Sequence, residues 1–341
     1  MKSRFALVVL FVFAAIALAI VPLSAQDDVF SVAAVAPSAT TDLAFSQSMF
    51  DALTLLDEEM GEAFEFTFQE GTFIVDDAAV ALREWASSGE YDLVIAHGSQ
   101  YGSIVEELAA EFPEVSFAWG TDVNTFGLDN VFAYTAASDQ GGYINGYLAA
   151  MISESGSIGV VGPIEVGDAK LYVDGFQVGA LAANPDVEVN VTYIQSFSDV
   201  PLATEAANAF VANGADVLTG TAQMVVGPIG VALENELAWF GTQSSQADLS
   251  EGAGVAFQVY RFDVILKDMI AKIGEGTLGG ESYTITLENG GLEMVVSELM
   301  SDEDMVMVLE TIETLTAGII AGEIMTLPEM MEATPEATAT G

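Results

Sequence analysis

The chain has 341 residues, of which 51 are acidic and 7 are basic, and its formal net charge is −44. This charge excludes nucleic acid as a partner, because phosphate binding needs clustered lysine and arginine. Cysteine is absent and His97 is the single histidine, which excludes disulfides, thiolate or multi-histidine metal sites and a cysteine nucleophile.

The N-terminal segment has the pattern of a secretory signal. Lys2 and Arg4 precede an apolar run at 5–23, and the small pair Ser24 and Ala25 ends it before polar residues follow. We expect cleavage after Ala25 and a mature protein at the periplasmic or extracellular face of the cytoplasmic membrane, not a cysteine-linked lipoprotein. The alternative is a retained anchor, because an apolar run of this length can span a bilayer.

Short apolar runs then alternate with stretches of helical periodicity. The runs predict strands at 29–35, 64–68, 93–96, 115–119, 130–134, 158–161, 187–194, 216–218 and 238–241. The periodic stretches predict helices at 49–60, 76–86, 104–112, 143–152, 172–183, 203–213 and 229–236, and the acidic cluster at 301–304 reads as a solvated helix start. This alternation predicts an α/β fold with parallel sheets covered by helices on both faces.

The number of strands and the length favour two doubly wound lobes over one domain. We expect residues 1–25 to be the signal peptide, 28–136 to form lobe 1 with part of 255–324 returning to it, and 137–254 to form lobe 2. Residues 325–341 are rich in Thr, Pro, Glu and Ala, which predicts a disordered tail.

A binding cleft is expected where the strands end. Ligands bind beyond the carboxyl ends of the strands in open parallel sheets. Two facing lobes would therefore form one cleft from the segments 36–45, 97–101, 120–124, 162–167, 196–199, 220–223 and 242–246.

Motifs for catalysis are missing from the sequence. There is no P-loop, no dinucleotide-binding glycine loop and no GxSxG elbow. The segment beginning at Asp122 starts like a calcium loop but fails at Phe126 and Ala133. We therefore predict no catalytic residue, no metal site and no cofactor, and we favour binding over catalysis.

A series of short motifs occurs along the chain in a fixed order. They are DLAFSQS at 42–48, YDLVIAHG at 91–98, FPEVSFA at 112–118, NV at 130–131, GYINGYLAA at 142–150, GFQVGA at 175–180, NPD at 184–186, SFSD at 196–199 and GADV at 214–217. Together they resemble the basic membrane protein family, whose members are nucleoside-binding receptors of ABC importers.

The resemblance implies the type I periplasmic-binding-protein fold, with two lobes joined by hinge strands. It also implies a purine held between aromatic rings at Phe45 and Phe197, since flat heteroaromatic rings stack well on phenyl faces. From the residues alone, Phe45 could instead pack in the core, and Phe197 could cap the end of a strand.

Several positions depart from the family pattern. Ser46 stands where the family has an asparagine, Ser138 where it has an acid before the second-lobe helix, and Gln243 where an acid contacts ribose. The expected lysine near Tyr260 is missing, although Arg261 is adjacent. The ligand could thus be a nucleobase, a modified nucleoside or an unrelated molecule.

The expected ligand-binding residues come from these motifs and from the strand ends. They are Asp42, Phe45, Ser46, His97, Gly98, Asp122, Ser138, Phe197, Gly220 and Gln243. His97 has two interpretations, a satisfied histidine at a strand end or a partner for a ligand edge. The second would make binding depend on pH near the usual histidine pKa of about 6.5.

We expect a monomeric extracytoplasmic solute-binding protein of an ABC importer. Its two lobes would close around a purine nucleoside or nucleobase and present it to a membrane permease. One alternative is a ligand-sensing module for a membrane receptor, which a neighbouring kinase gene would favour. Another is a nucleoside-processing enzyme, which product formation from a bound nucleoside would favour.

Overall fold

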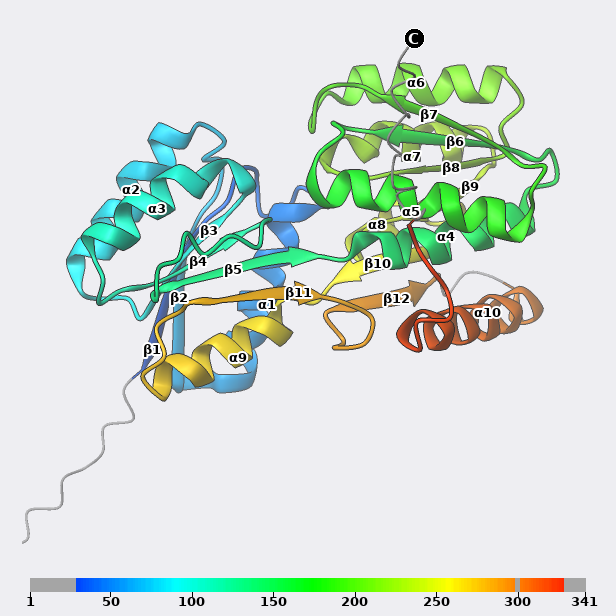
Figure 1. Ribbon diagram of the computed structural model, residues 1–341. Helices are drawn as coiled ribbons and strands as arrows, with labels where there is room; N and C mark the ends of the chain where they lie inside the picture. Colours follow the sequence, from blue (N-terminus) through cyan, green and yellow to red (C-terminus); the bar gives the residue numbers. More distant parts are fainter. Residues whose placement is uncertain (1–28, 298–300, 328–341) are drawn as a thin grey trace, which may run out of the picture.

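The protein folds into two α/β lobes, each built around a six-stranded sheet (Figure 1). The computed structural model describes residues 29–297 and 301–327. The expected signal peptide at 1–25 lies outside these residues, as does most of the expected tail. None of the helices in the described ranges is both long and apolar enough to cross a membrane.

The first sheet has the order β11-β5-β4-β3-β1-β2, and its neighbouring strands are all parallel. Its strands are β1 (Phe30–Val35), β2 (Phe64–Gln69), β3 (Leu93–His97), β4 (Ser116–Gly120), β5 (Val131–Ala136) and β11 (Glu281–Ile285). Helices α1 (Phe45–Met60) and α9 (Phe262–Gly274) cover one face, and α2 (Val75–Ser88) and α3 (Gly102–Glu111) cover the other. Strands β3 and β4 are buried along their whole length, as expected for strands covered on both faces.

The second sheet has the order β12-β10-β9-β8-β6-β7. Its strands are β6 (Ser157–Gly162), β7 (Glu188–Tyr193), β8 (Val217–Gly220), β9 (Ala238–Gly241), β10 (Gly254–Tyr260) and β12 (Leu292–Val296). Helices α4 (Ser138–Ile152), α5 (Gly167–Ala183) and α10 (Asp302–Ile320) cover one face, and α6 (Val200–Ala212) and α7 (Val226–Glu234) cover the other. The short helix α8 (Ser245–Leu249) follows β9.

The α/β fold with two lobes is confirmed, with one difference in strand direction. Strand β12 runs antiparallel to β10, so the second sheet is mixed. The chain passes between the sheets after β5, after β10 and between β11 and β12. Strand β10 runs toward this hinge and β12 enters the lobe from it, so the two strands must run in opposite directions.

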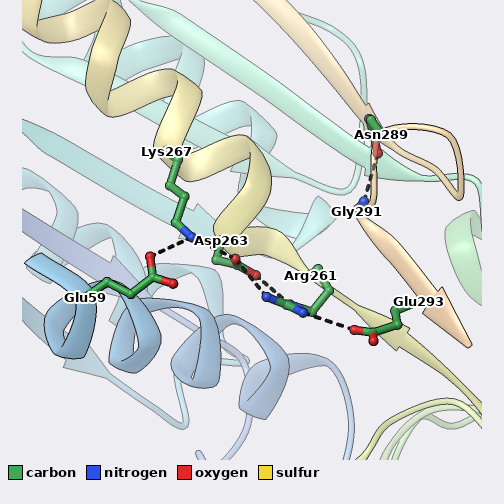
Figure 2. Close-up of polar contacts among 7 residues, drawn as sticks. All are labelled: Glu59, Arg261, Asp263, Lys267, Asn289, Gly291 and Glu293. Carbon is green, nitrogen blue, oxygen red and sulfur yellow. Dashed lines mark hydrogen bonds and ion pairs between the residues drawn. The ribbon is translucent and has the colours of Figure 1, made fainter. Parts of the chain in front are cut away.

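Charged side chains from both lobes are joined at the hinge (Figure 2). Arg261 joins Asp263 of α9, at 2.9 Å, to Glu293 of β12, at 3.0 Å. Lys267 joins the same aspartate to Glu59 of α1, at 3.3 and 2.7 Å. The guanidinium next to the position of the expected lysine is therefore held by two carboxylates outside the cleft.

Glycines let α4 and α5 pack with their backbones in contact. A Cβ on Gly146 would lie 1.9 Å from the carbonyl oxygen of Phe176, and one on Gly179 would lie 1.9 Å from that of Tyr143. Real Cβ atoms do not approach this closely, so larger residues would push the helices apart. This packing fixes the position of α5, whose first turn places Asp168 at the cleft.

Most predicted elements are observed, with bounds that differ by a few residues. Ser301 caps α10, because its hydroxyl accepts a hydrogen bond from the backbone N–H of Asp304. Strand β10 extends the second sheet, whereas α9 and β11 belong to the first. At the start of the expected tail, the Thr326 hydroxyl donates a hydrogen bond to Asp139.

Candidate functional site

A cavity of about 250 Å³ lies between the lobes at the carboxyl ends of the parallel strands. It is small for a pocket that holds a drug-sized ligand, since such pockets measure about 300–1,000 Å³. Each of the seven predicted cleft segments contributes to its lining. The lining residues are Pro37, Ser38, Ala44, Phe45, Phe73, Gly98, Ser99, Gln100, Thr121, Val166, Gly167, Asp168, Ala169, Phe197, Ser198, Thr221, Ala222, Gln223, Thr242, Gln243 and Tyr260.

Aromatic rings line the cavity from both lobes. Phe45 begins α1 in the first lobe, and Phe197 follows β7 in the second. The ring of Phe45 is stacked on the imidazole of His97, with centroids 3.7 Å apart and planes 10° apart. His97 thus supports Phe45 from behind and does not itself line the cavity.

Both ring nitrogens of His97 are hydrogen bonded within the fold. Nδ1 lies 2.8 Å from the Tyr134 hydroxyl, and Nε2 lies 2.9 Å from the Phe45 carbonyl oxygen. The ring is fully buried, and burial lowers the pKa of His97 to about 3. The first interpretation of His97, a satisfied strand-end histidine, matches this geometry, and the imidazole stays neutral near pH 6.5.

A polar cluster joins the two lobes at one side of the cavity. Asp42 accepts hydrogen bonds from the Ser38 hydroxyl and from backbone N–H groups at the start of α1. From the second lobe, Gln223 Nε2 donates to Ser38 Oγ at 2.9 Å and to Asp42 Oδ2 at 3.2 Å. Gln246 Nε2 donates to the Leu43 carbonyl at 2.9 Å. These bonds between lobes describe a closed arrangement.

Asp168 is the charged residue that lines the cavity. It lies in the first turn of α5, only 8 % exposed, and its Oδ1 accepts a hydrogen bond of 3.0 Å from the Thr135 hydroxyl of the first lobe. Its Oδ2 has no hydrogen-bonding partner. Burial raises the pKa of Asp168 to about 7, and hydrogen bonds from Thr135 and the Ala136 backbone oppose this shift only partly.

Two more polar atoms of cavity residues lack a partner. They are Gln223 Oε1, an acceptor, and Gln100 Nε2, a donor. Buried polar groups are normally paired, and an unpaired one costs free energy. Together with Asp168 Oδ2, these are the buried polar atoms of cavity-lining residues that have no hydrogen-bonding partner within the protein.

The structure separates the predicted site residues into three groups. Phe45, Gly98, Phe197 and Gln243 line the cavity. Asp42, Ser46, His97, Ser138 and Gly220 lie behind the lining; for example, Ser138 is fully buried and hydrogen bonded to the Tyr260 hydroxyl. Asp122 is exposed and accepts backbone hydrogen bonds from Val123 and Asn124.

Sequence reasoning missed several polar lining residues, above all Asp168, Gln100, Gln223 and Tyr260. The predicted cleft segments include Gln100, Gln223 and Gly167, which precedes Asp168. The position of these residues at strand ends could therefore have indicated them. For Asp168 the local pattern was ambiguous, because acids are common in first helical turns, where the helix dipole favours them.

Among residues 29–297 and 301–327, no lysine or arginine lines the cavity. In the part of the chain that the structure describes, these residues are Arg83, Lys170, Arg261, Lys267 and Lys272, and each is ion-paired with acidic residues. The cavity therefore offers aromatic faces and acceptors but no fixed positive charge.

Two hinged α/β lobes with a cavity between them define a type I periplasmic-binding-protein fold. The profile of the family described as PnrA-like ABC transporter substrate-binding protein matches residues 29–323. The chain belongs to this family, which confirms the resemblance drawn from its motifs. It is thus an ABC transporter substrate-binding protein, whose class implies a small-molecule ligand and a permease partner.

Several known proteins are similar to this chain at about a quarter sequence identity. A purine-binding protein of Brucella abortus is 26 % identical over 267 residues, which cover 78 % of this chain and 74 % of that protein. The transcriptional activator protein Med of Bacillus subtilis is 25 % identical over 238 residues, 70 % of this chain and 73 % of that protein. A solved ABC transporter solute-binding protein from Conexibacter woesei superposes with a TM-score of 0.73 at 24 % identity, covering 88 % of this chain and 98 % of that one. This last likeness supports the fold alone.

Proposed function

We propose that this protein is exported and binds a purine nucleoside or nucleobase in the cavity between its lobes for delivery to an ABC permease. The observation that carries the proposal is the cavity itself, lined by Phe45 from one lobe and Phe197 from the other, with unpaired polar atoms beside them. Aromatic side chains hold a flat base by stacking, and polar atoms recognise its edge. The purine-binding name of the Brucella relative points the same way.

Closure of the lobes supplies the mechanism. Each of Gln223, Gln246 and Thr135 makes a hydrogen bond from one lobe to the other next to the cavity. A ligand that contacts both lobes would favour the closed arrangement in the same way, since a ligand shifts an equilibrium toward the state that it binds better. The permease would then recognise the closed form.

Mass spectrometry of the small molecule released on denaturing the purified protein tests the ligand class. Competition calorimetry with adenosine and adenine then tests the role of ribose. We expect the free base to bind within about tenfold of its nucleoside, about 1.4 kcal/mol, because Gln243 and Ser138 replace acids that the family pattern has at these positions. The proposal would be refuted if no purine binds to the protein and none co-purifies with it.

A second function, ligand sensing, is favoured by one comparison. The Bacillus relative is named a transcriptional activator, and the similarity to it covers 73 % of its length. Sensing would use the same cavity and the same closure, with a regulatory partner in place of a permease. Capture of the ligand-loaded protein by an ABC permease would favour transport. Incubation with a bound nucleoside, followed by product analysis, tests the expectation that no reaction occurs.

A further inference from the structure

We propose that Asp168 selects the ligand, and that Asp168 Oδ2 accepts a hydrogen bond from an N–H donor on the heteroaromatic ring. The donor would be an exocyclic amino group or a ring N–H. This inference rests on the proposed function and makes it more specific, because it states which edge of the ligand the protein recognises.

The first argument is the geometry of the carboxylate. Its Oδ1 is occupied by the Thr135 hydroxyl, so the side chain is held in place from the opposite lobe. Its Oδ2 is buried without a partner in a side chain that lines the cavity. A site with a buried unpaired acceptor binds ligands that supply the missing donor and rejects analogues that lack it.

The second argument is the balance of unpaired groups around the cavity. Gln223 Oε1 is a second free acceptor, because Nε2 of the same amide donates to Ser38 and Asp42. Gln100 Nε2 is a free donor. Two acceptors and one donor, with no lysine or arginine in the lining, suit a ligand edge that is richer in N–H groups than in lone pairs.

The third argument comes from the ionisable groups around Asp168. From β5, Tyr134 has a pKa raised well above its usual value by burial, and from β10, burial raises the pKa of Tyr260. His97, beyond Tyr134, has a pKa of about 3. None of these three changes its charge between pH 5 and 8.

Two carboxylates of neighbouring elements have partners of their own. Asp139, in the first turn of α4, accepts a hydrogen bond from Thr326. Asp42 accepts five hydrogen bonds, including the one from Gln223. Asp168 is therefore the carboxylate that a donor in the cavity would meet unpaired.

These conditions fix the sign of a pH effect on binding. An N–H donor stabilises the ionised carboxylate, so binding lowers the pKa of Asp168 from about 7 and releases a proton. Affinity should thus rise as the pH rises through 7. If protonated Asp168 instead donated to a ring nitrogen, affinity would rise as the pH falls.

The test is calorimetric titration of the full chain at pH 5.5 and 7.5 with three probes. Adenosine carries an exocyclic amino group, inosine carries a ring N–H, and purine riboside carries neither. For adenosine or inosine we expect wild-type affinity to increase roughly 10- to 30-fold between the two pH values. For Asp168→Asn we expect about tenfold weaker binding at pH 7.5 and no pH dependence.

The matched control is Asp174→Asn on the same helix, which removes the same charge from a residue paired with Lys170. It should retain the wild-type pH profile. The inference is overturned if Asp168→Asn keeps that profile, if affinity rises toward low pH, or if purine riboside shows the same dependence on Asp168, since only ribose hydroxyls could then donate. Failure of all three probes to bind wild type overturns the proposed function and this inference together.

Discussion

Asp168→Asn should remove a loss of stability with rising pH that the ligand-free wild type carries. Burial raises the pKa of Asp168 to about 7 in the folded protein, whereas the ordinary value is 3.8. Between these values the folded state holds a proton that the unfolded state has lost. The contribution of Asp168 to the free energy of unfolding is therefore present at low pH and is lost as the pH rises toward 7.

The size of the effect follows from the shift. Each pKa unit corresponds to about 1.36 kcal/mol, so a shift of about three units amounts to about 4 kcal/mol. Asparagine resembles the protonated acid in shape but does not ionise. The variant should match wild type near pH 4 and exceed it by about 4 kcal/mol at pH 7 to 8. Substitutions that stabilise a protein at its binding site commonly reduce its function.

Urea unfolding of both proteins from pH 4 to 8, followed by tryptophan fluorescence, measures this difference. Trp85 and Trp119 report on the first lobe, and Trp239 reports on the second, which carries Asp168. The other carboxylates are the same in both proteins and cancel in the comparison. A difference in stability that stays constant across the pH range would refute the reasoning.

His97 should give the opposite dependence of the free energy of unfolding on pH in the same experiment. Its pKa is lowered from 6.5 to about 3, so its contribution to stability is present above pH 6.5 and is lost as the pH falls toward 3. Between about pH 4 and 6.5 the two buried groups therefore act against each other in wild type. Relative to wild type, His97→Gln should lose stability as the pH rises from 4 to 6.5, the opposite of Asp168→Asn.

Three further outcomes are expected. Phe197→Ala should weaken purine binding by about 1–3 kcal/mol in calorimetry, the range for aromatic–base stacking, whereas Phe112→Ala, outside the cavity, should not change it. Gly146→Ala should lower the melting temperature through overpacking of about 1–3 kcal/mol against Phe176, whereas Gly230→Ala, with open space around it, should not; equal melting temperatures would contradict the close helix packing. The melting temperature of wild type should rise from low salt to about 1 M sodium chloride, because salt screens repulsion among the 51 acids, and a flat series would show that this repulsion is too dispersed to matter.

The sheets and most helices could be predicted from sequence because their signals are local. Alternating apolar runs and helical periodicity located the elements from β1 to β9, and Ser301 marked the start of α10. No strand was predicted for β10, β11 or β12. The antiparallel direction of β12 could not be predicted from local signals, because it depends on the side from which the chain re-enters the second lobe. The cleft segments were predictable for a different reason, since parallel strands bring their carboxyl ends to one edge of a sheet.

The individual site residues were harder to predict because position along a strand does not determine which way a side chain faces. His97 ends β3 at the cleft, yet its ring lies behind Phe45 and bonds to Tyr134. Asp168 begins a helix, where an acid is usually solvated, yet the neighbouring strand β5 buries it. Whether such a side chain lies behind the cavity lining or in it depends on contacts between segments that are distant in the sequence.

The departures from the family pattern and the position of Asp168 both concern the acid of the cavity. Ser138 and Gln243 stand where the resemblance leads one to expect acids, and Ser138 is bonded to Tyr260 behind the lining. A carboxylate appears instead at Asp168, on a different segment of the same lobe. The acidic side chain of this cavity therefore lies on a segment other than those where the resemblance implies acids. A ligand stacked on Phe45 would then turn a different edge toward the acid, which is why the identity of the N–H donor, more than the presence of ribose, should decide what this protein binds.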